Sequence, residues 1–304
     1  MSWIDEAGDD WTAAAVSPQL WQNIAEMGPD AERWLDSVPE RVATIENAWG
    51  LEVGPPVSAE GHVSVAFEAR TANGVDAVLK VTVPHDEAET EAAALQRWGG
   101  RGAVKLLGAS DDGFTLLLER CRPGHDLFTL PPDEHVDVLA ELFPQLWIQP
   151  HGNEPFPELD ATVARWERDL PALGDRLGVR QELAGDARRW AAELRCDMPR
   201  RILHGDLHPQ NVLAAQRQPW LAIDPKPWVG DPAFDLAQTL VNWVRIGPTE
   251  RGAAVEDVLR RARRLSGVLG LDVNRVLRWA VVKGFGWEFA AEETLVLHGA
   301  ATSV

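Results

Sequence analysis

The feature of this sequence that most constrains its fold is a change in the spacing of its apolar residues. Between about residues 56 and 120, apolar residues alternate with polar ones in short runs, which is typical of half-buried strands. After Arg122-Pro123-Gly124 they recur every three or four residues, which is typical of amphipathic helices. We therefore predict an α+β fold in which a small, mostly antiparallel β-rich part precedes a larger helical part.

The first part of the chain predicts a helical extension followed by a sheet. Residues 1–55 are predicted to be helical, with a cap at Ser17-Pro18 and a capping-box spacing at Ser37-Val38-Pro39-Glu40. Asn73-Gly74 is a tight-turn dipeptide between two alternating runs, so it predicts a β-hairpin. The elements predicted for residues 56–121 are strands at 63–67, 75–83, 104–108 and 114–120, and a helix at 86–98.

The second part of the chain predicts helices that a polar segment interrupts. This interruption, residues 201–224, contains short β-like pieces and most of the polar residues discussed below. We predict two domains, an N-terminal lobe at 1–121 and a helical C-terminal lobe at 122–304, with ligands bound in a cleft between them. The predicted helices lie at about 133–147, 158–177, 180–195, 232–245, 249–269 and 272–297.

The composition excludes several classes of partner. The formal net charge is -18, so phosphate backbones and anionic membranes are not expected partners, whereas a cationic small molecule would be attracted. Acidity that simply keeps a protein soluble is the alternative. No stretch approaches the roughly 18 apolar residues of a membrane span, and the acidic N-terminus lacks the basic region of a signal peptide. Two cysteines suit a reducing compartment, although one disulfide is the alternative. We expect a cytoplasmic monomer or weak dimer.

The strongest chemical signal lies in the segment His204-Gly205-Asp206-Leu207-His208-Pro209-Gln210-Asn211. Asn211 follows Asp206 by five residues, and Asp224 ends a second apolar run thirteen residues after Asn211. Phosphoryl transfer from ATP requires a carboxylate that orients the attacking hydroxyl, together with oxygen ligands that hold Mg²⁺ against the phosphates. One catalytic Asp, an Asn five residues later and an Asp on the next strand is the spacing of a kinase catalytic loop.

This segment resembles the signature of aminoglycoside kinases, in which His-Gly-Asp replaces the His-Arg-Asp of protein kinases. The following residues, Ile223 to Ala237 with Gly230-Asp231-Pro232 and Asp235, look most like the aminoglycoside/hydroxyurea phosphotransferases, which include streptomycin-phosphorylating enzymes. The resemblance extends from about residue 40 to 290. It implies a bilobal protein-kinase-like fold with a catalytic loop at 202–213 and a metal-binding segment at 221–235. It also implies that Asp206 is catalytic and that Asn211 and Asp224 bind Mg²⁺.

Lys80 is the predicted phosphate-binding lysine. It lies late in the second strand of the predicted hairpin, where a kinase has a lysine that reaches the α- and β-phosphates of ATP. A helix carboxylate must position this lysine, and the next helix offers Glu87, Glu89 and Glu91. The Glu-x-x-Ala-Leu pattern of the resembled family selects Glu91.

Two further segments are predicted to contact the nucleotide. Leu116 to Cys121 is in the position of a connector between lobes, so we expect backbone groups of Glu119 and Cys121 to bond the adenine, although an ordinary edge strand is the alternative. The chain has no G-x-G-x-x-G motif between its first strands, which argues against a protein kinase. The sequence from Pro55 to His62 offers one glycine and one serine, Ser58, which we take as the candidate phosphate contact.

The residues that bind the acceptor are less well defined by the sequence. Lys226, beside Asp224, is expected either to contact phosphate or substrate or to form an ion pair within its loop. Glu288 and Trp287 are candidate contacts to a cationic acceptor positioned at Asp206, through charge and a flat aromatic surface, although a solvated helix face and a buried core are the respective alternatives. Asp231 and Asp235 are expected to cap the helix that follows them and to brace the catalytic loop.

These predictions describe an enzyme that uses ATP and Mg²⁺ to phosphorylate a hydroxyl of an aminoglycoside, preferably of the streptomycin type, which would confer resistance by inactivation. Hydroxyurea and a small metabolite, such as a sugar or an amino alcohol, are alternative acceptors. A metallohydrolase with zinc bound by His204, Asp206 and His208 is an alternative of a different class. A nucleotide-binding pseudokinase without activity is another.

Overall fold

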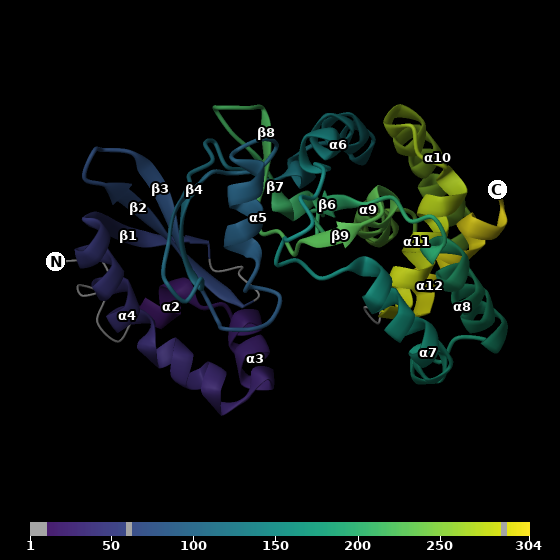
Figure 1. Cartoon of the computed structure of the whole chain (residues 1–304), viewed down its shortest axis with the longest axis horizontal. Coiled ribbons are helices and arrows are strands. Elements are labelled where there is room, and N and C mark those ends of the chain that lie inside the picture. The colour runs from purple at the N-terminus through teal and green to yellow at the C-terminus, as the bar shows by residue number, and fades with distance from the viewer. Residues whose placement is uncertain (1–10, 59–62, 287–290) are drawn as a thin grey trace. The chain divides into compact units, whose positions relative to one another are not determined.

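The computed structural model describes residues 11–58, 63–286 and 291–304, and the chain divides into two compact units, Met1–Arg122 and Pro123–Val304 (Figure 1). The first unit contains a five-stranded sheet, and the second is mostly helical. This confirms the predicted α+β class.

Among the described residues, no helix is both long enough and apolar enough to cross a lipid bilayer. Cys121 is a buried cysteine and Cys196 an exposed one.

The sheet of the first unit is antiparallel throughout, with strand order β1-β2-β3-β5-β4. Its predicted hairpin is confirmed, because Gly74 adopts φ 76° in the turn and its N–H donates to the carbonyl of Thr71 at 2.8 Å. The strands are β1 (Leu51–Ser58), β2 (Ser64–Thr71), β3 (Asp76–Thr82), β4 (Leu106–Ala109) and β5 (Thr115–Glu119), with helix α5 (Glu91–Trp98) between β3 and β4.

Strand β1 corrects the predicted boundary of the helical extension, because residues 51–55 were expected to be helical. The preceding helix ends at Trp49, and Gly50 adopts the left-handed φ of 63° that glycine tolerates at a helix end. Leu51 and Val53 are buried with an exposed residue between them, so this segment alternates as a strand does. The sheet therefore has five strands where the sequence predicted four.

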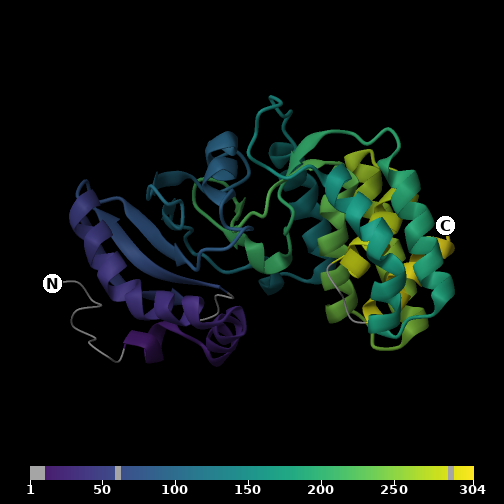
Figure 2. The same ribbon diagram turned by 60° about the horizontal axis from the view of Figure 1, so that its bottom comes forward.

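From residue 11 onward, where the description begins, three helices precede the sheet: α2 (Trp11–Ala15), α3 (Pro18–Met27) and α4 (Pro29–Trp49), of which α4 lies against β1 (Figure 2). Ser17 Oγ accepts a hydrogen bond from the N–H of Leu20 at 3.1 Å, which confirms the predicted cap of α3. Apolar side chains of these helices share one buried cluster with the strands, among them Leu20, Ile24, Leu35, Val38, Val42, Phe67, Leu79 and Val81.

The second unit contains the remaining helices and two short two-stranded sheets. The region predicted as one helix at 272–297 is described as α11 up to Gly286 and α12 from Ala291, and residues 287–290 between them lie outside the described residues. The helices are α6 (Pro132–Leu146), α7 (Leu159–Leu177), α8 (Gln181–Arg195), α9 (Pro232–Ile246), α10 (Arg251–Leu269), α11 (Val273–Gly286) and α12 (Ala291–Thr302), with 3₁₀ turns η2 (Leu127–Thr129) and η3 (Pro209–Asn211).

The two short sheets bring the polar segment together. Strand β6 (Arg201–Leu203) pairs with β9 (Trp228–Gly230), and β7 (Val212–Ala214) pairs with β8 (Trp220–Ala222), both antiparallel. The loop at 204–211 leaves β6 and enters β7, and the loop at 223–227 leaves β8 and enters β9. Each of the two loops therefore joins one two-stranded sheet to the other and is fixed at both ends.

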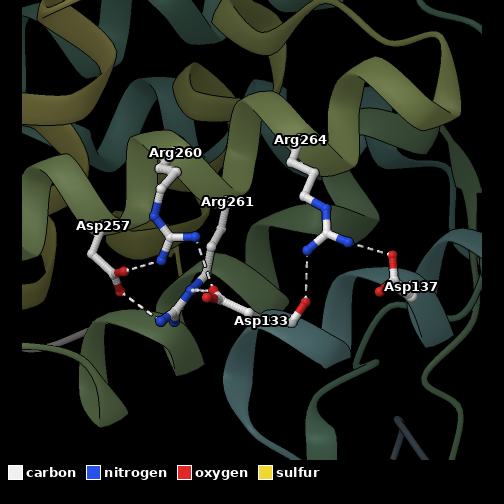
Figure 3. Close-up of polar contacts among 6 residues, drawn as sticks. All are labelled: Asp133, Asp137, Asp257, Arg260, Arg261 and Arg264. Carbon is white, nitrogen blue, oxygen red and sulfur yellow. Dashed lines mark hydrogen bonds and ion pairs between the residues drawn. The ribbon is translucent and has the colours of Figure 1, made fainter.

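An ion-pair cluster joins α10 to α6 (Figure 3). Arg264 Nη2 lies 2.6 Å from Asp137 Oδ1, between exposed side chains. The pair of Arg261 Nη2 with Asp257 Oδ2, at 2.9 Å, is different because both side chains are largely buried, at 9% and 13% exposure. The cluster comprises Asp133 and Asp137 of α6 and Asp257, Arg260, Arg261 and Arg264 of α10.

Candidate active site

The sharp turn after β6 explains why glycine stands in His-Gly-Asp. Gly205 has φ 80°, a left-handed conformation that disfavours side chains. A Cβ at this position would lie 1.9 Å from the carbonyl oxygen of Lys226 and 2.8 Å from Cδ1 of Trp228. The close approach of the two loops therefore requires glycine, and Asp206 follows it as a buried carboxylate at 6% exposure.

The carboxylate of Asp235 stabilises this turn through hydrogen bonds, as predicted. Its carboxylate accepts hydrogen bonds from the N–H of His204 at 2.9 Å and of Gly205 at 2.6 Å, and it also accepts from Nε1 of Trp147 at 2.9 Å. Asp231 caps α9, because its Oδ1 accepts from the N–H of Ala233 at 2.9 Å. The expected structural roles of Asp231 and Asp235 are confirmed.

His204 is a fully buried, neutral histidine. Its Nε2 lies 3.0 Å from the carbonyl oxygen of Ile223, which can only accept, so Nε2 carries the proton. The N–H of Asp206 then points to the unprotonated Nδ1 at 3.4 Å. Burial lowers the pKa of His204 against the opposing effect of the carboxylates of Asp235, Asp206 and Asp224, so the neutral form is retained.

This arrangement contradicts the zinc alternative, because backbone groups engage both ring nitrogens of His204. Zinc needs such a nitrogen as a ligand. Within the described parts of the chain, no three His, Cys, Asp or Glu side chains form a metal-binding group.

Asn211 and Asp224 are tied to the same turn. Asn211 Nδ2 donates to the carbonyl oxygen of Asp206 at 2.9 Å. The other side-chain atom, Oδ1, is therefore the one that Asn211 can offer to a metal ion. The N–H of Ile223 donates to the carbonyl of Asn211 at 3.0 Å, so the residue before Asp224 is bonded to Asn211. An amide oxygen and a carboxylate are the hard oxygen donors that suit Mg²⁺.

Asp224 also has an unusual backbone. It is half-buried with φ 55°, and only one other non-glycine residue in the described part of the chain, Asp197, has a positive φ. Such a conformation costs of order 1–3 kcal/mol and is concentrated at functional sites. The positive φ of Asp224 fits a side-chain carboxylate that must point in one particular direction to act as a ligand.

Lys226 forms an ion pair with the predicted catalytic carboxylate. Its Nζ lies 3.0 Å from Oδ2 of Asp206, and its backbone N–H donates to the carbonyl of His204 at 2.9 Å. The sequence indicated an ion pair within the loop or a contact with phosphate or substrate, but it did not identify Asp206 as the partner. Nε2 of His208 is 4.0 Å from the same oxygen.

In the first unit, Lys80 and Glu91 form a buried ion pair. Lys80 Nζ lies 2.9 and 2.7 Å from the two carboxylate oxygens of Glu91, and the residues are 8% and 3% exposed. Side chains alternate along β3, so Lys80 projects from the face opposite to Leu79 and Val81. The N-terminal helices pack on the face of Leu79 and Val81, whereas α5, which begins with Glu91, lies on the face of Lys80.

The other predicted nucleotide contacts are located but not tested by the structure. The N–H of Glu119 donates to the carbonyl of Lys105 at 2.9 Å, so an adenine contact by Glu119 would have to use its carbonyl oxygen. Cys121 follows the end of β5 and is buried. Ser58 is the last residue of β1 and pairs with Ala66. Trp287 and Glu288 lie outside the described residues.

The sequence reasoning missed Lys283. This residue of α11 is fully buried, and its Nζ donates to the carbonyl of Gly205 at 2.8 Å. Two signals were available, because the chain has only four lysines and this one interrupts the apolar run Ala280-Val281-Val282.

Comparison with known proteins places these features in a family. Residues 50–291 match the model of the aminoglycoside/hydroxyurea antibiotic resistance kinases. The chain is 36% identical to a hydroxyurea phosphotransferase of Kitasatospora aureofaciens over 269 residues, which cover 86% of this chain and 76% of that protein. It is 35% identical to a streptomycin 6-kinase of Streptomyces griseus over 263 residues, which cover 84% and 83% of the two proteins.

Solved structures show the same fold. A thermostable mutant of aminoglycoside phosphotransferase APH(4)-Ia, in complex with ADP and hygromycin B, superposes with a TM-score of 0.58 at 16% identity and covers 88% of this chain and 98% of its own. A fructosamine-3-kinase of Thermobifida fusca gives a TM-score of 0.54 at 19% identity, with 86% and 98% covered. These matches confirm the predicted kinase-like fold. Together with the sequence matches, they lead to one conclusion: the chain is a phosphotransferase that belongs to the aminoglycoside/hydroxyurea antibiotic resistance kinase family.

Proposed function

We propose that this protein transfers the γ-phosphoryl group of ATP to a hydroxyl of an aminoglycoside, preferably of the streptomycin type, and thereby inactivates it. The observation that carries the proposal is the turn at Asp206, where a buried carboxylate is paired with Lys226 and bonded through its backbone to Asn211. The relatives named streptomycin 6-kinase and the ADP complex of a structural neighbour support the choice of acceptor and nucleotide.

Each predicted nucleotide contact has its own role in this proposal. The ammonium of Lys80, fixed by Glu91, binds the α- and β-phosphates. Backbone groups of Glu119 and Cys121 bond the adenine, and Ser58 is the candidate phosphate contact in place of a glycine-rich loop. Oδ1 of Asn211 and the carboxylate of Asp224 hold Mg²⁺, which neutralises charge on the phosphates when it is bound.

Asp206 orients the acceptor hydroxyl and takes its proton. As the O–H bond breaks, the acceptor oxygen forms a bond to the γ-phosphorus, and the bond from that phosphorus to the β-phosphate oxygen breaks, so the products are a phosphate ester and ADP. Positioned proton transfer of this kind contributes about 10²–10⁴-fold. Lys226, whose Nζ is 3.0 Å from Asp206, is placed to contact the phosphoryl group in transit and to offset its negative charge.

The acceptor is a small cationic molecule in this proposal, because a chain of net charge -18 attracts cations. Glu288 and Trp287 are the proposed acceptor contacts in the C-terminal part. A cytoplasmic location and a monomer or weak dimer complete the proposal, since ATP and reduced thiols are both found there.

Hydroxyurea is the second candidate acceptor, because the relative from Kitasatospora aureofaciens is a hydroxyurea phosphotransferase with 36% identity. One experiment separates the candidates. The protein is incubated with Mg²⁺ and ATP and, in parallel, with streptomycin, other aminoglycosides, hydroxyurea, and a panel of sugars and amino alcohols. Mass spectrometry then records which acceptor gains one phosphoryl group.

The expected result is a phosphorylated aminoglycoside that is absent with Asp206→Asn. Phosphorylation of hydroxyurea alone would replace the first candidate with the second. Nucleotide binding without phosphorylation of any acceptor would refute the proposed activity and favour a pseudokinase.

A further inference from the structure

A lysine that is fully buried in a helix needs a physical explanation. Lys283 is 0% exposed, and its neighbours Val282 and Phe285 are equally buried. Burial of an ammonium is costly unless the charge is hydrogen-bonded or paired. Its Nζ has the Gly205 carbonyl as an acceptor at 2.8 Å and lies 4.6 Å from the ring centroid of Phe234, a distance at which the ring face attracts a cation.

The acceptor of this hydrogen bond is the peptide unit that joins Gly205 to Asp206. Its carbonyl group accepts from Lys283, and its N–H group points to Nδ1 of His204. The two N–H groups before it, those of His204 and Gly205, donate to the carboxylate of Asp235. A buried cation and a buried anion therefore hold opposite sides of the turn that presents Asp206.

The direction of the Asp206 side chain depends on the plane of this peptide unit. Gly205 has φ 80° and no side chain, so local sterics restrict its rotation weakly. Hydrogen bonds to charged groups are stronger than those between neutral groups. The bond from Lys283 is thus the contact that fixes the carbonyl side of the plane.

We propose that Lys283 is a positioning residue for phosphoryl transfer: its buried ammonium fixes the Gly205–Asp206 peptide plane and hence the catalytic carboxylate. The inference rests on the proposed role of Asp206. Lys283 acts through the backbone, so its loss affects the rate of transfer rather than the binding of ATP.

The test compares Lys283→Met, Lys283→Arg and a control, Val281→Ala, in the full-length protein. Val281 is a fully buried residue of the same helix, so its truncation measures the effect of weakened α11 packing alone. For each variant, kcat and the KM for ATP are measured with the acceptor found above, and Tm is measured by thermal unfolding.

Lys283→Met is expected to lower kcat about 100-fold, because misplacement of a reacting group by about 1 Å has such an effect, and to leave the KM for ATP within about threefold. Lys283→Arg, which keeps the charge but not its position, is expected to recover part of the lost kcat. Val281→Ala is expected to lower Tm at unchanged kcat. If Lys283→Met does not fold, Lys283→Arg decides, with a kcat several-fold below wild type at constant KM as the expected result.

A wild-type kcat in Lys283→Met would overturn the inference, as would one in Lys283→Arg if the Met variant does not fold. A loss of Tm without loss of kcat would show a role in stability only. Asp206→Asn separates this failure from failure of the proposed function. If Asp206→Asn is inactive and Lys283→Met is fully active, only the positioning role is wrong; if Asp206→Asn is active, the catalytic assignment itself is wrong.

Discussion

Substitution of Gly205 by alanine most directly tests the geometry of the turn that presents the proposed catalytic residue Asp206. The added Cβ would lie 1.9 Å from the carbonyl oxygen of Lys226, whereas real Cβ contacts under 3.0 Å are essentially unknown. Either the turn or the opposing loop must therefore move by about 1 Å. The backbone cannot relax to a negative φ without losing the two hydrogen bonds that Asp235 accepts, at 2.9 and 2.6 Å, from His204 and Gly205.

The expected magnitude has two parts. A non-glycine residue in the left-handed region costs about 1–2 kcal/mol, and the steric conflict adds to this loss of stability. For activity, a shift of about 1 Å at a reacting group corresponds to a loss of about 10²-fold. We therefore expect Gly205→Ala to lower kcat at least about 100-fold, with a smaller effect on nucleotide binding, since Lys80 and Glu91 belong to the first unit.

Gly185→Ala is the matched control. Gly185 lies inside α8, and a Cβ there would meet nothing within 4 Å. Alanine is a better helix former than glycine, so this variant should gain about 0.5–1 kcal/mol of stability and keep full activity. Both variants are assayed for kcat with the phosphorylated acceptor and for Tm. A Gly205→Ala enzyme with kcat within about threefold of wild type and an unchanged Tm would refute the reasoning.

Three further outcomes are expected. Asp206→Asn should lower kcat about 10²–10⁴-fold while ATP still binds, as checked by kinetics and calorimetry; a variant with normal turnover would exclude Asp206 as the proton acceptor. Asp257→Asn breaks a buried pair with Arg261 and should lower the free energy of unfolding by up to about 3 kcal/mol. Asp137→Asn, at an exposed pair, should lower it by less than about 1 kcal/mol. Equal losses, measured by chemical denaturation, would contradict the argument from burial. Because burial lowers the pKa of His204, the unfolded state binds more protons than the folded state below about pH 6.5, so stability should fall as pH falls below that value. The slope of Tm against pH should therefore be flatter in His204→Gln than in the wild type. Parallel slopes would contradict this assignment.

The sheet shows which parts of the fold the sequence could predict. Asn73-Gly74 and its alternating flanks specify their hairpin locally, because the turn chemistry and the pairing lie within a few residues. Strand β1 was missed because Pro55-Pro56 reads as a break in a strand, and only the register with β2, around Val53 and Ala69, reveals the pairing.

Helix α4 shows a local signal that the tertiary structure overrides. Ser37-Val38-Pro39-Glu40 predicted a helix start, yet α4 continues through Pro39. Ser37 Oγ donates to the carbonyl of Trp34 at 2.7 Å instead of capping a new helix. Trp34, Val38 and Val42 form one buried stripe across the proline, so packing against the sheet maintains a continuous helix.

The candidate site also contains some residues that the sequence could predict and others that it could not. Asp206, Asn211 and Asp224 could be predicted because their spacing is short and the family pattern fixes it. Glu91 was selected among three carboxylates, and the structure pairs it with Lys80. The sequence signals could mark Lys283 but not its partner, because the contact joins residues 78 positions apart in the sequence. Such contacts depend on how α11 packs beside the turn at Gly205, which no local pattern encodes.

The two edge strands of the first unit's sheet affect how prone the chain is to associate while it is being synthesised. Within the described residues, β1 pairs only with β2 and β4 only with β5, so these two strands form the sheet's borders. Pro55 and Pro56 leave two adjacent positions of the edge strand β1 without an amide donor, and the other edge strand, β4, has four residues. A foreign extended peptide needs an unbroken row of amides to add itself to a sheet. The first unit, which leaves the ribosome before its helical partner, therefore offers little template for association between nascent chains.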